Sequence, residues 1–175
     1  NRLVISPNNS LRLYAATRTG IFRSLDGGAT FAKIKDGTSV NGCMDIAIQP
    51  NRAIAYVFAS CGSFATDGVY RFLDNNNPVT PALVFTQTGM GRTSLAISPS
   101  NPSVVYAMST ALSGAWANAL LGVYRSISNG ASGTWTTQVT TVGAPAETSA
   151  AYQNMLLLNN PVYDYTVCVG SSRQI

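Results

Sequence analysis

The sequence of 175 residues predicts an all-β fold, a partial β-propeller of about three four-stranded antiparallel blades plus the start of a fourth. The first observation behind this prediction is a sequence motif that occurs three times. In each copy an apolar stretch ends at a proline, a strand follows, and Gly-[Ile/Val]-[Phe/Tyr]-Arg ends the motif. The second is the spacing of its glycines (Gly20, Gly68 and Gly122), because roughly 50 residues is the period of repeats that are themselves small sheets. The third is composition, since charged residues make up only 10% of the chain and Ser, Thr, Asn and Gly are abundant.

The three copies of the motif predict the same strands in each repeat. Their first parts are Ile5-Ser6-Pro7, Ile48-Gln49-Pro50 and Ile97-Ser98-Pro99, followed by Leu13-Tyr14-Ala15-Ala16, Ala55-Tyr56-Val57-Phe58 and Val105-Tyr106-Ala107-Met108. In the third repeat, alternation and turn residues place four strands near residues 94–98, 103–109, 122–127 and 134–139. Such a meander has two apolar faces, and packing against sibling sheets around an axis buries both.

The repeats divide the chain into one propeller segment with units at about residues 1–40, 41–90 and 91–145, and an incomplete unit at 146–175. Residues 162–170 are similar to the second strand of a fourth unit. Propellers have about 4–8 blades, so we expect the chain to be a piece of something larger, completed by more of the same chain or by another subunit.

Between the third and fourth strands of the first repeat stands Ser24-Leu25-Asp26-Gly27-Gly28-Ala29-Thr30-Phe31. In this turn the Asp26 carboxylate should accept backbone N–H groups and Gly28 should allow positive φ, while Phe31 should pack against the next sheet. The third repeat has a degenerate copy with Ser128 in the Asp position, and the second repeat keeps Asp74 but loses the rest. The residues that the third repeat retains are Ser126, Gly130, Thr134 and Trp135.

This turn matches the Asp box, and the chain resembles the Asp-box (BNR-like) repeat superfamily of β-propellers over nearly its whole length. That superfamily includes xyloglucan-cleaving glycoside hydrolases, sialidases and sortilin-type receptors. The resemblance implies propeller blades in which the Asp box has a structural role. It does not choose among those activities.

Seven carboxylates are present, and a glycoside hydrolase needs two that face each other across a groove. Asp26 and Asp74 lie in turns at the end of the blades opposite to that where propeller sites occur, so they are poor candidates. Asp67 is the best of the remaining acids, and Asp45, near the start of an inner strand, is a further candidate that could face the central channel. The run Thr66-Asp67-Gly68-Val69-Tyr70-Arg71 resembles the catalytic segment of xyloglucan-cleaving enzymes, with shorter spacing. Since Asp before Gly is also common turn chemistry, we favour a loop-capping role for Asp67 and predict no catalytic residue.

The basic residues are scattered, which argues against nucleic-acid binding despite a net charge of +4. Arg23, Arg71 and Arg125 recur at one blade position, which favours a structural role, the stem covering the neighbouring sheet and the head bonding carbonyls, over the three-arginine site of sialidases. The absence of His excludes His-based triads and His metal sites, so neither a metal nor a cofactor is expected. No apolar run approaches the about 20 residues of a membrane-spanning helix.

Cys43 and Cys61 come opposite each other if a hairpin centred on Asn51-Arg52 pairs Ile48 with Tyr56. A disulfide between them is then one expectation and two free thiols the alternative, while Cys168 is expected to be a buried free thiol. A disulfide would agree with a secreted or extracellular, cell-surface location.

The loops that join second and third strands lengthen along the chain and carry two aromatic residues, Phe64 and Trp116. Both are candidate contacts for a protein partner or a sugar ring, the alternative for Trp116 being that it folds over a neighbouring blade. The leading hypothesis is a non-catalytic scaffold or protein-interaction module whose partner is another protein or the rest of its own propeller. The alternatives are part of a polysaccharide-degrading glycoside hydrolase, xyloglucanase-like or sialidase-like, and a receptor-like ligand-binding propeller.

Overall fold

The computed structural model describes residues 1–37, 42–75, 77–112 and 120–140, and in these ranges the chain is all strand and turn. The strands are β1 (Arg2–Ser6), β2 (Asn9–Thr17), β3 (Gly20–Ser24), β4 (Ala32–Asp36), β5 (Cys43–Ile48), β6 (Tyr56–Cys61), β7 (Gly68–Leu73), β8 (Ala82–Phe85), β9 (Met90–Ile97), β10 (Val105–Ala111), β11 (Leu120–Ser126) and β12 (Trp135–Thr140). The described ranges contain no helix that is long and apolar enough to cross a membrane.

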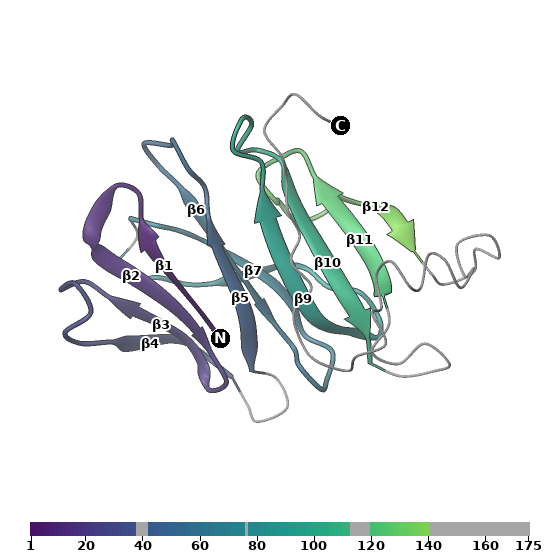
Figure 1. The fold of residues 1–175 in the computed structure, drawn as a ribbon, viewed down its shortest axis with the longest axis horizontal. Helices are drawn as coiled ribbons and strands as arrows, with labels where there is room; N and C mark the ends of the chain where they lie inside the picture. The colour runs from purple at the N-terminus through teal and green to yellow at the C-terminus, as the bar shows by residue number, and fades with distance from the viewer. Residues whose placement is uncertain (38–41, 76, 113–119, 141–175) are drawn as a thin grey trace.

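These strands form three antiparallel sheets, each a meander of four strands in sequence order. Figure 1 shows the sheets β1–β4, β5–β8 and β9–β12 side by side along the long axis of the molecule. The first strands of the three sheets lie next to one another: β5 contacts both β1 and β9. This arrangement confirms the predicted partial propeller for its first three blades, and the expected fourth unit at 146–175 lies outside the described residues.

The recurring glycine begins the third strand of two sheets because the fourth strand leaves no room for a side chain there. A Cβ on Gly20 would collide with the carbonyl oxygen of Lys35, and one on Gly68 with that of Phe85. Just beyond each recurring glycine the pairing with the fourth strand shifts register, after Ile21, Val69 and Val123 respectively. The β-bulge at the same place in each sheet explains why the repeat retains glycine.

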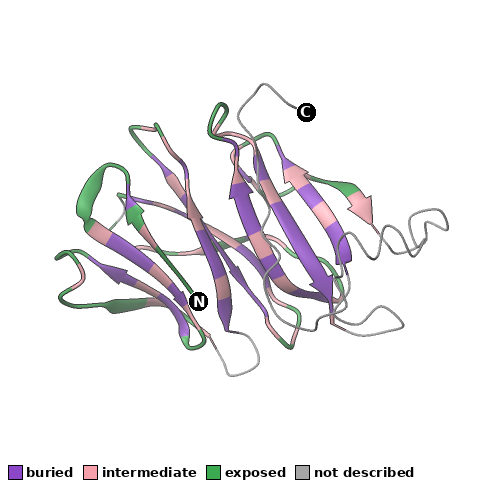
Figure 2. Ribbon diagram, in the orientation of Figure 1, coloured by how far each residue is buried: buried purple, intermediate pink, exposed green. Residues whose placement is uncertain are grey.

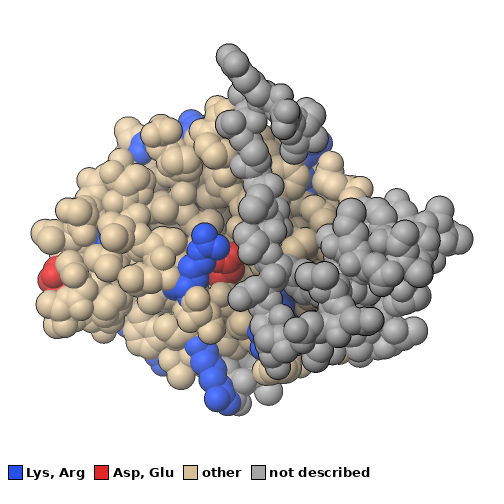
Figure 3. All heavy atoms as spheres, in the orientation of Figure 1, with Lys and Arg blue, Asp and Glu red and all other residues tan. Residues whose placement is uncertain are grey.

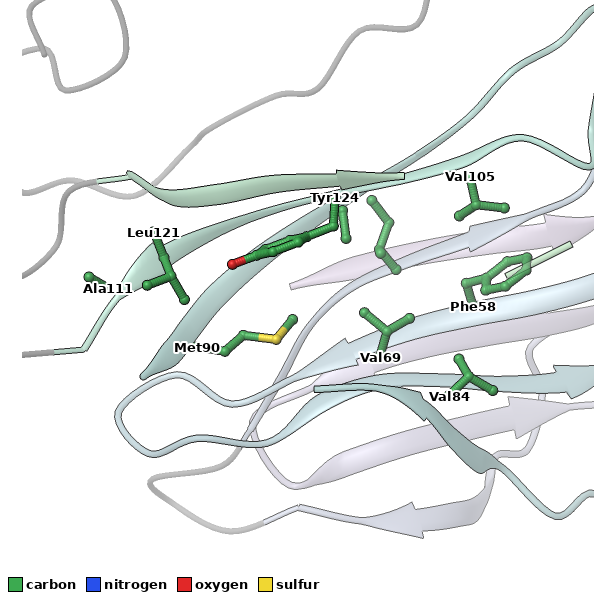
Figure 4. Packing of buried hydrophobic residues seen from close by; sticks show 10 residues of the cluster. Phe58, Val69, Val84, Met90, Val105, Ala111, Leu121 and Tyr124 are labelled. Carbon is green, nitrogen blue, oxygen red and sulfur yellow. The ribbon is translucent and has the colours of Figure 1, made fainter. Parts of the chain in front are cut away.

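The cores lie between the sheets, as expected for sheets with two apolar faces. The first junction buries residues of β2 and β3 against β5, β6 and β7, with Tyr14, Ile21 and Ile46 fully buried. The second junction is centred on Phe58, Val69, Met90 and Tyr124, and Figure 4 shows these side chains converging between the two sheets. The Phe85 and Trp135 rings stack across it with centroids 5.1 Å apart.

The β5–β6 hairpin differs by one residue from its predicted register. Ile48 pairs with Val57 rather than Tyr56, and a shift between Cys43 and Asp45 compensates for the difference. Cys43 therefore lies directly opposite Cys61, and the two form a disulfide.

Burial is uneven across the three sheets, as Figure 2 shows. Strands β6, β10 and β11 are mostly buried, whereas β1 and β4 are mostly exposed or intermediate. The two edge strands of the first sheet are thus largely open to solvent.

Candidate functional site

The antiparallel topology places the candidate residues at two opposite ends of the sheets. The connections β2–β3, β6–β7 and β10–β11 share one end, here called the loop end, and the connections β3–β4, β7–β8 and β11–β12 share the other, the turn end. Asp67 and Phe64 belong to the loop end, and Asp45 lies near it on β5. Trp116 lies outside the described residues.

Asp67 lies at the junction of the first two sheets, held by groups from both. The Tyr70 hydroxyl donates a hydrogen bond of 2.7 Å to Asp67 Oδ1, and Lys35 Nζ lies 3.7 Å from Asp67 Oδ2. Lys35 also lies over the Tyr70 ring, 4.2 Å from its centroid. Burial, followed by the hydrogen bond to Asp67, raises the pKa of Tyr70, so the phenol keeps its proton and remains the donor. Only 13% of the Asp67 side chain is exposed, and its contacts connect β4 to β7.

Asp45 connects the first strands of all three sheets. Its Oδ1 accepts hydrogen bonds from Arg2 at 3.1 Å and from its neighbour Ile46 N–H at 2.8 Å, and its Oδ2 accepts one of 2.8 Å from Leu95 N–H. The residue is 6% exposed. Since an edge strand leaves backbone N–H groups unpaired, this carboxylate satisfies such a group on β9 while pairing with a cation on β1.

Phe64 is the most exposed large apolar side chain among the described residues, with 68% of its surface accessible. The Arg92 guanidinium of β9 lies 5.4 Å from its ring centroid. Beside it, the Ser63 hydroxyl contacts Met44 Sδ at 2.8 Å, which fixes the start of the 62–67 loop to β5. An aromatic ring and an arginine therefore stand together at the loop end.

The turn at residues 24–31 has the expected internal hydrogen bonds. Ser24 Oγ accepts a bond of 2.9 Å from Gly28 N–H, and Asp26 Oδ1 accepts one of 2.9 Å from Thr30 N–H. The Thr30 hydroxyl donates to Asp26 Oδ2, and this bond, with the backbone bond next, holds the pKa of Asp26 well below its usual range. All these partners lie within the turn, which is consistent with a structural role for Asp26.

We predict that Asp26→Asn lowers the melting temperature at neutral pH and that this difference shrinks on acidification. Because the folded-state pKa of Asp26 lies below its unfolded value of about 3.9, its contribution is complete above that pH and is lost as pH falls further. Thermal unfolding followed by circular dichroism from pH 7 to acid would measure this. The control Asp36→Asn changes a carboxylate with 91% of its side chain exposed, and an equal effect there would contradict the prediction.

The sequence predicts that Phe31 packs against the next sheet, and the structure contradicts this prediction. It is 42% exposed, whereas its counterpart Trp135 packs on Phe85 of the preceding sheet. The aromatic residue of this turn therefore belongs to the junction on the preceding side, and in the first sheet no described residue covers that side. The degenerate turn of the third sheet otherwise keeps its internal bonds, since Ser126 Oγ accepts a bond of 3.1 Å from Gly130 N–H and lies 2.7 Å from Thr134 Oγ1.

Asp74 has a larger structural role than its sequence position suggested. It is 1% exposed and accepts bonds from three residues of the first sheet: Ser6 Oγ at 2.7 Å, Tyr14 Oη at 3.0 Å and Arg12 Nη1 at 3.1 Å. Burial, with the nearby Asp74 charge second, raises the pKa of Tyr14. The carboxylate thus joins two sheets at the turn end.

Two of the three recurring arginines, Arg23 and Arg71, reach the turn of the following sheet. Arg23 Nη2 donates to Asn77 Oδ1 at 3.1 Å, and Arg71 Nη1 donates to the Asn129 carbonyl at 2.8 Å. This is the structural role that the sequence predicted for these positions, although Arg23 bonds a side-chain amide rather than a carbonyl. On the face in Figure 3, the basic side chains lie in several separate places. The described residues also contain no group of three His, Cys, Asp or Glu side chains placed to hold a metal.

Comparison with solved structures finds a similar fold in the crystal structure of an ancestral GH74 enzyme. The two align with a TM-score of 0.55 and 19% sequence identity, over 77% of this chain and 18% of that enzyme. The chain therefore spans less than a fifth of the enzyme's length. No family model matches the sequence. No curated protein matches it either. The similarity shows a propeller-like fold of three antiparallel four-stranded sheets.

Proposed function

We propose that this chain is a non-catalytic, secreted or cell-surface propeller segment that acts as a scaffold or protein-interaction module. The observation that carries the proposal is the state of its described carboxylates. Asp26, Asp45, Asp67 and Asp74 all accept hydrogen bonds or pair with cations inside the fold. Asp36 extends into solvent beside Lys33, 3.2 Å away.

Glycoside hydrolysis needs one carboxyl group as acid and a second as base or nucleophile, both open to the substrate. Asp45 and Asp67 are nearest to meeting this need by position, but their side chains are only 9% and 13% exposed. Their carboxylate oxygens already bind groups on β1, β4, β7 and β9. A structural role explains these contacts without a substrate.

The interaction surface that we assign is the loop end around Phe64 and Arg92. Interfaces derive much of their binding energy from aromatic and arginine side chains, and these two lie together at the loop end, with the Arg92 guanidinium 5.4 Å from the Phe64 ring centroid. Trp116 belongs to the next loop in the same series and is proposed as part of the same surface. The Cys43–Cys61 disulfide supports an oxidising, extracellular location.

The second candidate is part of a polysaccharide-degrading glycoside hydrolase, favoured by the structural similarity to a GH74 enzyme and by the Asp-box resemblance. In this alternative Asp67 is one acid and its partner lies outside this chain. A receptor-like ligand-binding propeller is the third candidate and shares the loop end as its binding surface.

A hydrolysis assay separates the first two candidates. We expect the purified chain to release no reducing sugar from xyloglucan or other β-glucans, and Asp67→Asn to behave identically. A measurable rate that is lost in Asp67→Asn but kept in the control Asp36→Asn would overturn the scaffold proposal. A glycan array supplies a second measurement, because tight and specific sugar binding that Phe64→Ala abolishes would favour the carbohydrate-active alternative.

A further inference from the structure

The loop of residues 62–67, which joins β6 to β7 at the loop end, is fixed at its first end to the start of β5. The Cys43–Cys61 disulfide joins the residue just before the loop to the first residue of β5. The first residue of the loop continues this connection, because Gly62 N–H donates a hydrogen bond of 3.0 Å to the Gly42 carbonyl. A covalent bond and a backbone hydrogen bond therefore hold consecutive residues at this end of the loop.

Asp67 fixes the other end of the loop through groups of the first two sheets. Its carboxylate accepts the hydrogen bond of the Tyr70 hydroxyl and pairs with Lys35 of β4. The Thr86 hydroxyl, just after β8, donates to the Asp67 carbonyl. Because the carboxylate is mostly buried, solvent screens its ion pair less than that of a surface pair. The last residue of the loop is thus held through both its side chain and its backbone.

The two fixed ends of the loop also pack against each other. Gly62 has a φ of +107°, a conformation that residues with a side chain rarely adopt. A Cβ on this glycine would lie 2.9 Å from the Ala65 carbonyl oxygen and 3.0 Å from Asp67 Cβ, which leaves no room for a side chain. The loop therefore closes on itself, and glycine fits where its ends meet.

Phe64 lies inside this closed loop, and the third sheet also contributes to its position. The Arg92 guanidinium of β9 lies 5.4 Å from the centroid of its ring. The ring is still largely exposed. The backbone that carries the ring is held at both ends, while the ring itself is open to a partner. Groups from all three described sheets thus determine where this exposed aromatic side chain stands.

We propose that the Cys43–Cys61 disulfide and Asp67 are positioning residues that order the 62–67 loop and orient the Phe64 ring before a partner binds. This inference rests on the proposed function, in which the loop end is the interaction surface. A mobile loop that becomes ordered on binding loses conformational entropy, and a loop that is already ordered avoids most of that loss. The shape of the interaction surface therefore depends on two groups that are themselves too buried to form much of it.

Fluorine NMR of the whole chain, with 4-fluorophenylalanine incorporated at position 64, tests this inference. In the wild type we expect one narrow resonance, displaced from its position in the urea-unfolded chain by the groups around the ring. In Cys43→Ala/Cys61→Ala and in Asp67→Ala the resonance should move toward the unfolded position. The Gly62 amide should also exchange with deuterium about tenfold faster or more in both variants, because its protection depends on the order of the loop.

Asp74→Ala is the matched control, since it weakens the same sheet at the turn end and leaves the loop intact. A loss of stability alone should leave the fluorine resonance of the folded chain at its wild-type position, so Asp74→Ala should not move it. Tyr14→Phe makes the same comparison at a smaller loss of stability. Circular dichroism would check that each variant is folded, and Asp67→Ala decides the test if the cysteine variant does not fold.

Two results would overturn the inference. One is a wild-type resonance that already lies at the position of the unfolded chain, because the ring would then have no fixed surroundings. The other is a resonance that stays in place in Asp67→Ala, or that moves equally in Asp74→Ala. Both measurements are made without a partner, so either result leaves the interaction surface of the proposed function standing.

Discussion

Asp74→Ala is expected to destabilise the protein by about 3–5 kcal/mol, the cost of removing one partner from a buried ion pair. The substitution leaves the Arg12 guanidinium and the Ser6 hydroxyl without the carboxylate oxygen that they share in the folded protein. It also removes one of the two acceptors of the Tyr14 hydroxyl, leaving the Asp74 carbonyl at 2.7 Å. Urea unfolding followed by circular dichroism would measure the change in free energy of unfolding.

Two further variants show whether the effect belongs to this junction. Tyr14→Phe removes only a hydroxyl and should cost about 1 kcal/mol, since the carboxylate keeps its other partners. Asp36→Ala removes a carboxylate with 91% of its side chain exposed and should change stability by no more than about 0.5 kcal/mol. A loss in Asp74→Ala no larger than that in Asp36→Ala would contradict the structural role that we assign to this carboxylate.

Removing the Cys43–Cys61 disulfide is expected to cost about 3 kcal/mol, from the entropy of closing a loop between residues 18 apart in sequence. The double variant Cys43→Ala/Cys61→Ala should therefore unfold at lower urea concentration than the wild type. Both cysteines are buried in the first junction, at 0% and 1% exposure, so loss of packing adds to the effect.

Reductant and thiol counting provide the controls for the disulfide. Reductant should destabilise the wild type and leave the double variant unchanged. Of the three cysteines, one thiol should react in the unfolded, unreduced wild type and all three after reduction. Three reactive thiols before reduction would contradict the disulfide.

The sheets and their order could be predicted from the sequence because each repeat keeps the residues that its own strands and turns need. Gly20, Gly68 and Gly122 recur beside a bulge in the fourth strand, and a glycine at such a bulge is visible in one sequence. The register of the β5–β6 hairpin was harder to predict, because the shift between Cys43 and Asp45 leaves no turn residue to mark it. Even so, the shift restores the predicted pairing of the two cysteines.

The roles of the acids depended on contacts between sheets, which sequence patterns do not specify. Asp45 is one of the candidate acids in the sequence, and its bond to Leu95 N–H becomes visible only when β9 is placed beside β5. The sequence shows Asp74 only as the retained residue of a degenerate turn motif, whereas its partners Tyr14 and Ser6 lie 60 and 68 residues earlier in the chain. The predicted packing of Phe31 is wrong for the same reason, since the motif determines the shape of the turn but not which sheet covers its aromatic residue.

The direction of the junctions has a consequence for how such a chain can be altered. The turns between third and fourth strands are bound by side chains of the preceding repeat, through Asp74, Asn77 and Asn129, so a cut between whole repeats leaves both the strands and the turn of each repeat intact. Moving the first repeat behind the last, or duplicating one of them, would preserve the type of contact at each remaining boundary. Gain or loss of whole repeats is then a simpler route to a new architecture than change within a repeat.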